Sequence, residues 1–341
     1  MSGMNHAAAK PLLEVRNLKE YFKIPGKGYL HAIDDISLDI MEHETLGLVG
    51  ESGCGKSTVG NVLTRLIDAT SGSVMFEGKD LLSLKGKDMK TVRKEIQMIF
   101  QDPYSSLNPR KTIRSILEEP YIIHNAGLSK AEMAKKVEEI ATLAGLETYV
   151  LNQYPHELDG GKRQMVGIAR ALALEPKFIV CDEPVSSLDV SVQATVINLL
   201  MDLQKKLGLT YLFISHDLSV VRHISNRVAV MYLGQIVELT DADTIFADTL
   251  HPYSIALLSA VPKVEFENKT KRIVLEGDVP SPLNPSKTGC RFANRCWMAC
   301  EDCKKITPEL KEVKPGHFVK CPYWEKSQEM AAKKLAEAAA K

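Results

Sequence analysis

The chain has 341 residues, with 43 basic and 43 acidic side chains, so its formal net charge is zero. At roughly 100–200 residues per domain, this length predicts two to three structural units. Equal numbers of basic and acidic side chains mean that the chain lacks the excess positive charge typical of nucleic-acid-binding proteins. No nucleic acid partner is therefore expected. The first residues lack the apolar core of a secretory signal, and no run of about 18 apolar residues predicts a membrane span.

The first part of the chain predicts two strands that lead to a helix. Residues 1–10 are expected to form a flexible N-terminus. Residues 32–40 alternate partly between apolar and polar side chains, which favours a strand with one solvated face. Residues 45–49 form a short apolar run that leads directly into a glycine-rich segment, and a helix is expected from Ser57 to about Ile67.

Residues 50–57 read GESGCGKS and match the G-x-x-x-x-G-K-[ST] pattern of a phosphate-binding loop. Glycines let backbone N–H groups face a triphosphate, and the helix N-terminus that follows favours anions. Lys56 is expected to direct its charge at the β- and γ-phosphates, and the Ser57 hydroxyl to ligate Mg²⁺. The alternative, a chance glycine-rich turn, is disfavoured because a strand precedes the segment and a helix follows it. The residues expected to bind ATP here are Gly50, Glu51, Ser52, Gly53, Cys54, Gly55, Lys56, Ser57 and Thr58.

The middle of the chain predicts mainly helices. Ser129 and Glu132 form a capping box, and Gly145 is a suitable C-cap for the helix between them. The helical segments before the next apolar run predict a helical subdomain at about 103–165. Helices are expected at 111–124, 130–144, 161–174 and 190–207.

Two short apolar runs, 178–182 and 211–215, have the character of parallel strands buried on both faces. Each run ends in polar residues at its carboxyl end, where open α/β sheets place functional groups. Asp182 is expected to hold Mg²⁺, and Glu183 to accept a proton from the attacking water or to orient it. His216 is expected to stabilise charge that develops on the γ-phosphate. The alternatives are an acidic pair at an ordinary strand end and a structural histidine.

In this order the motifs resemble those of the ATP-binding subunit of an ABC transporter, over roughly residues 11–325. Gln101 matches the Q-loop glutamine, which in the family touches Mg²⁺ and senses the membrane subunit. The segment 158–164 occupies the signature motif, and 187–189 matches the D-loop. The resemblance implies that two subunits close over two ATP molecules. The signature residues expected to face the ATP of the other subunit are Asp159, Gly160, Gly161 and Gln164.

The resemblance also implies a fold and a catalytic set. The fold is an α/β P-loop NTPase core with an antiparallel β edge, a helical subdomain and a small cysteine-rich C-terminal extension. Lys56, Glu183 and His216 are the implied catalytic residues, acting on ATP with Mg²⁺. Phe22 falls where the family stacks an aromatic ring on adenine, and Tyr21 is the alternative.

Three further segments, 101–110, 251–253 and 277–278, are similar to those of the oligopeptide/dipeptide importer group. This resemblance implies an ATPase that powers peptide import at the cytoplasmic face of the plasma (inner) membrane. The implied partners are a second ATPase subunit, two membrane permease subunits and an extracytoplasmic substrate-binding protein. The alternatives are import of an oligosaccharide or nickel, and a catalytically weak regulatory subunit.

The signature departs from the family pattern, which usually has serine at position 159 and glutamine at position 162. An ionised Asp159 would repel the γ-phosphate by about 4 kcal/mol per charge pair at ~4 Å and an effective dielectric of ~20. Lys162 would offset part of this repulsion. Asp159 is also a good helix N-cap, and both interpretations hold together. We therefore expect an asymmetric heterodimer in which the site completed by Asp159 is the weaker one.

Five of the seven cysteines gather near the C-terminus. Such a cluster, in a chain without an export signal, suggests a metal more than disulfides. Subunits of the importer group resemble this chain at four of these cysteine positions and are associated with a [4Fe–4S] centre. Zinc and no metal are the alternatives. Cys300 is a spare thiol or an alternative ligand. The residues expected to hold the cluster are Cys290, Cys296, Cys303 and Cys321.

The expected division of the chain follows from these changes in character. A nucleotide-binding domain is expected at 11–262, and a C-terminal extension with the cysteine cluster at 263–325. The segment 326–341 is rich in alanine, lysine and glutamate, and is expected to form a polar, solvated helix or a frayed tail.

Overall fold

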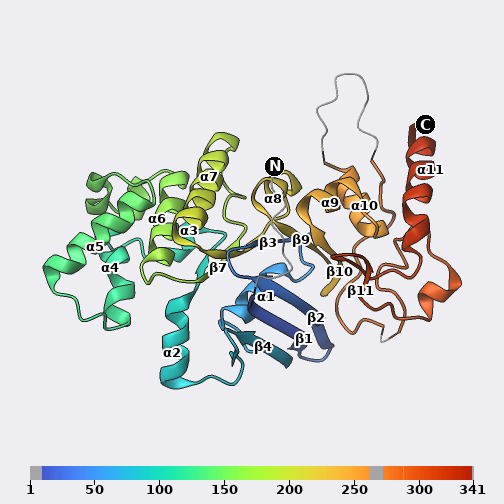
Figure 1. Ribbon diagram of the computed structural model, residues 1–341, viewed down its shortest axis with the longest axis horizontal. Coiled ribbons are helices and arrows are strands. Elements are labelled where there is room, and N and C mark those ends of the chain that lie inside the picture. Colours follow the sequence, from blue (N-terminus) through green and yellow to red (C-terminus); the bar gives the residue numbers. More distant parts are fainter. Residues whose placement is uncertain (1–9, 262–271, 287, 340–341) are drawn as a thin grey trace.

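The computed structural model describes residues 10–261, 272–286 and 288–339. The predicted flexible N-terminus, apart from residue 10, and the predicted boundary at 262/263 lie outside the described residues. Figure 1 shows a sheet at the centre of the molecule, helices 4 and 5 at one end and the C-terminal segments at the other. None of the helices in the described part has the length and apolar content needed to cross a bilayer.

The central sheet has eight strands in the order β11-β12-β10-β9-β3-β8-β7-β6. Strands β9, β3, β8, β7 and β6 run parallel, and β10 joins the sheet antiparallel through β9. Every residue of β3, β7 and β8 is buried, which confirms the parallel strands that the apolar runs predicted. The bounds are Thr45–Val49 (β3), Ile96–Ile99 (β6), Phe178–Asp182 (β7), Thr210–Ile214 (β8), Arg227–Tyr232 (β9) and Gln235–Asp241 (β10).

A second, four-stranded sheet forms the predicted antiparallel edge, in the order β2-β1-β4-β5. The expected strand at 32–40 lies within its longer strand β2. Apolar side chains of this sheet, such as Leu13 and Phe76, share one core cluster with Leu48 of the central sheet. The two sheets therefore pack on each other beside the phosphate loop (Figure 1). The bounds are Pro11–Ile24 (β1), Gly28–Met41 (β2), Ser71–Phe76 (β4) and Lys79–Asp80 (β5).

The predicted helices are present, with shifts at their ends. Both halves of the Ser129–Glu132 capping box form, and Gly208 ends α7 in the left-handed region at φ 66°. Helix α1 ends at Leu63 rather than at about Ile67, because Arg65 has φ 56° and breaks the helix. The bounds are Lys56–Leu63 (α1), Gly86–Glu95 (α2), Pro103–Ser106 (α3), Ile113–Ile123 (α4), Lys130–Leu143 (α5), Gly160–Leu172 (α6), Val190–Leu207 (α7), Leu218–Ile224 (α8), Ala242–Ala247 (α9), Pro252–Ser259 (α10) and Ser327–Ala339 (α11).

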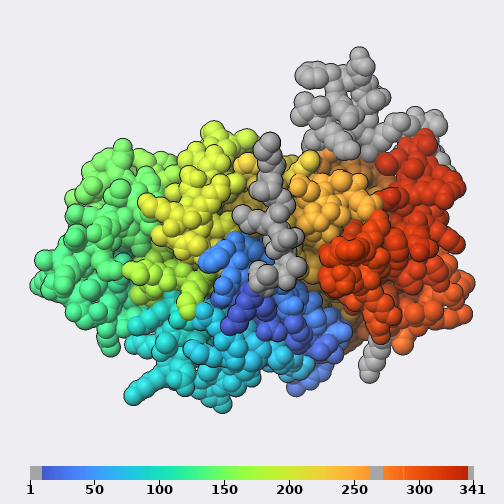
Figure 2. All heavy atoms as spheres, in the orientation of Figure 1, coloured from blue at the N-terminus to red at the C-terminus, as the bar shows by residue number. Residues whose placement is uncertain are grey.

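The C-terminal extension is built into the central sheet. Its strands β11 (Lys311–Lys314) and β12 (His317–Val319) form a hairpin, and β12 pairs with β10. Glu238 of β10 is fully buried and lies 2.8 Å from the ring nitrogen Nε2 of His317, which fixes the hairpin to the sheet. Figure 2 shows the extension packed closely against the segments that precede it.

The C-terminal helix is less exposed than its composition suggested. Ala331 of α11 is 4% exposed and shares a small core cluster with Ala256 of α10 and Ile273. The segment expected to be a solvated helix or frayed tail is a helix, and its face at Ala331 is buried. Small alanine side chains let α11 lie close to α10 (Figure 1).

His251, just before α10, is expected to make the folded state sensitive to acid. Its Nδ1 accepts a hydrogen bond from the Tyr253 amide at 3.1 Å, and burial lowers its pKa from 6.5 to about 3. Below about pH 6.5 the unfolded chain binds a proton at this histidine that the folded chain does not bind. The contribution of neutral His251 to the free energy of unfolding is therefore complete above that pH and decreases below it. The loss is up to about 1.4 kcal/mol of unfolding free energy per pH unit.

Denaturant unfolding at pH 7.5 and pH 5 measures this contribution. The unmodified chain should lose more stability between the two pH values than His251→Asn, whose amide oxygen accepts the same bond and does not titrate. Equal losses in the two proteins would show that His251 is not responsible.

Candidate nucleotide-binding site

The glycine-rich loop joins β3 to α1 and needs its glycines for space. Gly50 has φ 155° and Gly55 has φ 108°. A Cβ atom would lie 2.2 Å from the Met231 carbonyl oxygen at the first position and 2.1 Å from the Ala32 carbonyl oxygen at the second. Substituted side chains would therefore push the loop away from both sheets. At Gly53, with φ 78°, a Cβ atom would have no atom of the described residues within 4 Å, so they leave this side of the loop open.

Lys56 occupies the interior of this loop. Its Nζ donates to the carbonyl oxygens of Gly50 at 2.9 Å and Glu51 at 3.1 Å, and the residue is 5% exposed. No side chain caps the N-terminus of α1, where Gly55 is the N-cap. Free backbone amides, a helix N-terminus and a buried ammonium group fit an anionic ligand with several phosphates.

Ser57 and Asp182 meet beside the loop. The Ser57 hydroxyl donates to Asp182 Oδ1 at 2.9 Å, which joins the start of α1 to the end of β7. Burial raises the pKa of the Asp182 carboxyl, while the Ser57 hydrogen bond and the charge of Lys56 oppose that rise. A hydroxyl and a carboxylate are the oxygen donors that Mg²⁺ prefers, so the pair fits the predicted metal site.

Gln101, Glu183 and His216 converge on one oxygen atom. Gln101 Nε2 donates to Glu183 Oε2 at 2.9 Å, and His216 Nδ1 lies 3.2 Å from the same oxygen. Glu183 has φ 45°, a conformation that non-glycine residues adopt rarely and that is often found at functional sites. The three residues follow neighbouring strands β6, β7 and β8 of the sheet, which explains why they meet. A carboxylate held between an amide and an imidazole is suited to orient a water molecule or accept its proton.

The two aromatic candidates for the adenine contact differ in their surroundings. The Tyr21 ring stacks on His31 with centroids 3.8 Å apart, and its hydroxyl donates to Asp34. Phe22 is half-buried and lies next to it on β1. Because Tyr21 is already engaged within the protein, the surroundings favour Phe22 for the adenine contact, which stays a prediction.

The chain matches the family described as "ABC transporter" over residues 33–186 and the "Oligopeptide/dipeptide transporter, C-terminal region" over residues 237–303. The oligopeptide transport ATP-binding protein AppF of Bacillus subtilis is 51% identical, over 93% of this chain and 99% of that protein. The oligopeptide transport ATP-binding protein OppF of Salmonella typhimurium is 49% identical, over 92% of this chain and 96% of that protein. The chain belongs to the ABC transporter ATP-binding subunits.

Solved structures agree with this membership. The dimeric ATP-binding cassette MJ0796 in a post-hydrolysis state with ADP and Pi is 30% identical, with a TM-score of 0.62 over 67% of this chain and 98% of that one. CbiO1 of Clostridium perfringens, part of an ABC transporter complex, is 27% identical, with a TM-score of 0.62 over 70% of this chain and 91% of that one. The predicted P-loop NTPase fold and the ATPase class are thereby confirmed.

The signature segment of this ABC subunit begins helix α6. Asp159 is the N-cap, and its Oδ1 accepts a hydrogen bond from the Lys162 amide at 2.7 Å. The capping interpretation of Asp159 is therefore confirmed. The Lys162 ammonium group lies 3.2 Å from the Tyr149 hydroxyl and 4.0 Å from Glu147.

The signature glycines pack on the D-loop helix of the same chain. A Cβ at Gly161 would lie 2.5 Å from Val192 Cγ1, and one at Gly160 would lie 3.2 Å from Leu188 Cδ2. Gln164, predicted to face a second subunit, is 1% exposed, and its Nε2 has no hydrogen-bond partner among the described residues. In this conformation the Gln164 amide lies inside the subunit, and the sequence alone gave no sign of that burial.

The cysteines predicted to hold a metal surround one small cavity of ≈ 30 Å³, which Phe292 and His251 also line. Burial raises the pKa of Cys296 to about 12 and that of Cys321 to about 11. In the described part of the chain, no three or more His, Cys, Asp or Glu side chains are arranged to hold a metal ion. Cys300 lies outside the cavity lining, with its Sγ 3.5 Å from Cys303 Sγ.

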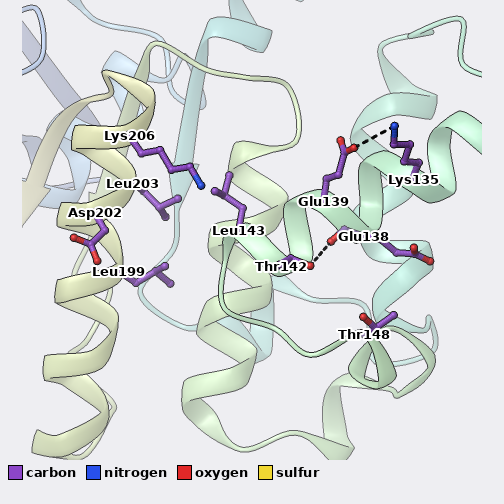
Figure 3. A pocket seen from close by; sticks show the side chains of 10 residues that line it. All are labelled: Lys135, Glu138, Glu139, Thr142, Leu143, Thr148, Leu199, Asp202, Leu203 and Lys206. Atoms are coloured by element: carbon purple, nitrogen blue, oxygen red, sulfur yellow. Dashed lines mark hydrogen bonds and ion pairs between the residues drawn. The ribbon is translucent and has the colours of Figure 1, made fainter.

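A larger hollow, of ≈ 660 Å³, lies between α5 and α7 in the helical part. Figure 3 shows side chains of both signs around it, among them Lys135 paired with Glu139, and Lys206. None of the residues predicted for the nucleotide site lines this hollow. It is therefore separate from the site described above.

Arg295 and Tyr253 contact the phosphate loop and were missed as site residues. The guanidinium of Arg295 pairs with Glu51, and the Tyr253 hydroxyl accepts from the Glu51 amide. In the sequence, the segment 251–253 only resembles the importer subfamily, and an arginine between cysteines gives no signal of its own.

Proposed function

We propose that this chain hydrolyses ATP to power the import of oligopeptides or dipeptides through two separate membrane permease subunits. Close relatives are named oligopeptide transport ATP-binding proteins, and the C-terminal match has the same description. The observation that carries the proposal is the convergence of Gln101 and His216 on Glu183, next to the Ser57–Asp182 pair.

In the proposed reaction, water attacks the γ-phosphorus of ATP held on the phosphate loop, the bond from that phosphorus to the β–γ bridging oxygen breaks, and ADP leaves. Glu183 accepts the proton of that water, and His216 stabilises the charge on the γ-phosphate. Lys56 leaves the loop carbonyls and binds the β- and γ-phosphates. Mg²⁺, held by Ser57, Asp182 and Gln101, would neutralise phosphate charge.

We infer that a second ATP-binding subunit completes each nucleotide site. The D-loop region offers an exposed apolar residue to such a partner, since Val190 is 82% exposed. A partner with serine in its signature would complete the site on this chain's loop. Asp159 would complete the partner's site and weaken it, which makes a heterodimer the proposed assembly. A catalytically weak regulatory subunit is the second candidate, and the contact of His216 with Glu183 argues against it.

The permeases are proposed to dock beside Gln101. A groove of ≈ 830 Å³ lies there, lined among others by Phe100, Ile123 and Arg170. Phe100 is 37% exposed and Ile123 is 61% exposed, so apolar side chains are available to an incoming segment of a membrane subunit. This docking would place the chain at the cytoplasmic face of the inner membrane, opposite an extracytoplasmic binding protein.

Reconstitution with the two permeases, a second ATP-binding subunit and the binding protein tests this function. We expect ATP hydrolysis that rises when the binding protein carries a peptide, together with uptake of that labelled peptide. Uptake of an oligosaccharide or of nickel instead of peptide would overturn the choice of cargo. Full transport with this chain's Glu183 replaced would favour the regulatory candidate.

We further propose that Cys290, Cys296, Cys303 and Cys321 hold a [4Fe–4S] cluster, with zinc as the alternative. The shared cavity supports this proposal, since all four cysteines line it. Thiolate ligands would supply the charge that the cluster needs.

Protein purified without oxygen is expected to be brown and to contain iron and sulfide. Cys321→Ala should lose the colour and most of the iron, whereas Cys300→Ala should keep both. Colourless protein with stoichiometric zinc would show that these cysteines hold zinc rather than an iron–sulfur cluster. Unchanged iron in Cys321→Ala would remove that residue from the ligand set.

A further inference from the structure

The C-terminal extension contacts the phosphate loop at one residue, Glu51. Arg295 Nη1 and Nη2 donate to the two Glu51 carboxylate oxygens at 2.8 and 3.1 Å. The Tyr253 hydroxyl accepts a hydrogen bond from the Glu51 backbone amide at 2.9 Å. The Arg295 side chain is 8% exposed, so water competes weakly for this fork-shaped pair. Both the main chain and the side chain of Glu51 are therefore held from outside the loop.

The core of the subunit fixes Arg295 in turn. Its amide donates to the carbonyl oxygen of Phe292 at 3.0 Å, which closes a turn between Cys290 and Cys296. Phe292 is 2% exposed and packs on Tyr232 and Tyr253, with ring centroids 5.2 and 5.5 Å apart. The Arg295 guanidinium lies 6.0 Å from the Tyr232 ring centroid. The packing of these aromatic side chains thus orients Arg295 toward the phosphate loop.

The loop has physical reasons to need this contact. Its glycines lose much conformational entropy when the loop is ordered for a ligand. An anchor at Glu51 orders part of the loop before ATP arrives. The carbonyl of Glu51 also accepts from Lys56 Nζ at 3.1 Å, so Glu51 helps to hold that lysine inside the loop until ATP binds. The Arg295 charge further offsets a carboxylate that would otherwise repel the phosphates.

We propose that Arg295 is a positioning residue of the nucleotide site, through which the C-terminal extension holds the phosphate loop ready for a triphosphate. This inference rests on the proposed function of that loop. Arg295 acts through Glu51 and touches no reacting atom. The extension would then take part in ATP binding by the chain that carries it, rather than serve only as an edge of the sheet.

Titration of the full-length chain with fluorescent MANT-ATP and Mg²⁺ tests the proposal. Arg295→Met should weaken binding about tenfold, the loss expected when a charge-assisted pair is broken. Adding Glu51→Gln to that variant should restore only part of the affinity, because the repulsion of the unpaired carboxylate is removed while the anchor stays lost. Arg295→Lys, which keeps the charge without the fork, should lie between. In the assembled transporter, KM for ATP should rise with little change in kcat.

Arg291→Met is the matched control. Arg291 lies in the same turn and pairs with Asp34 and the Leu233 carbonyl, so its loss removes a comparable ion pair without touching Glu51. We expect less than a twofold change in MANT-ATP affinity for this control. Affinity within twofold of the unmodified chain in Arg295→Met, or an equal loss in Arg291→Met, would overturn the proposal. If Arg295→Met does not fold, the MANT-ATP affinity of Arg295→Lys is compared with the same twofold limit. Failure of the unmodified chain to bind MANT-ATP would instead overturn the proposed function.

Discussion

Glu183→Gln is expected to lower ATP hydrolysis by the assembled transporter by about a hundredfold or more, the usual contribution of a general base. The glutamine keeps the size of the side chain and its contacts with Gln101 and His216, but it cannot accept the proton of the attacking water. ATP binding should remain, because Lys56 and the loop are unchanged. Steady-state phosphate release and MANT-ATP affinity measure the two effects separately.

Glu175→Gln is the matched control for this experiment. Glu175 is exposed, has positive φ as Glu183 does, and pairs with Lys136 on the helical part. Its substitution should leave both hydrolysis and binding unchanged. Turnover retained by Glu183→Gln, or an equal loss in the control, would refute the role of Glu183.

Asp159→Ser is expected to raise ATP hydrolysis by the isolated chain, which should otherwise show little activity. In a homodimer, Asp159 would face the γ-phosphate held by the other copy. At ~4 Å and an effective dielectric of ~20, each unit-charge pair there costs about 4 kcal/mol, so a gain of tenfold or more is expected after screening. Serine is as good an N-cap as aspartate, so the stability of α6 should be preserved.

Asp159→Asn separates the two parts of this effect. Asparagine keeps the cap to the Lys162 amide and removes the charge, but it lacks the serine hydroxyl. Phosphate release by the isolated chain should increase from the aspartate to the asparagine and then to the serine form. A rate that stays constant or falls in Asp159→Ser would remove the basis for an asymmetric dimer.

The grouping of the candidate site residues could be predicted because they lie at positions that sheet topology brings together. Gln101, Glu183 and His216 each follow a strand of one parallel sheet, and such strands end at a common edge. The phosphate loop was recognisable because its pattern is local, between a buried strand and a helix. The N-cap role of Asp159 was local too, and could be inferred from residue type and position.

Contacts between distant segments could not be predicted in this way. Glu51 and Arg295 are 244 positions apart, and neither residue type marks the other. The hairpin of β11 and β12 on β10 depends on a sheet edge that only the folded chain creates. The burial of Gln164 and Ala331 follows from helix packing, which composition does not determine.

Native mass spectrometry of this chain as Glu183→Gln, mixed with its partner ATP-binding subunit, tests most directly whether two chains share each nucleotide. With Mg-ATP, the two chains should associate and hold two ATP molecules between them. Without nucleotide they should separate. Failure of the two chains to associate at ATP concentrations that saturate each phosphate loop would contradict the shared site and the transport mechanism that depends on it.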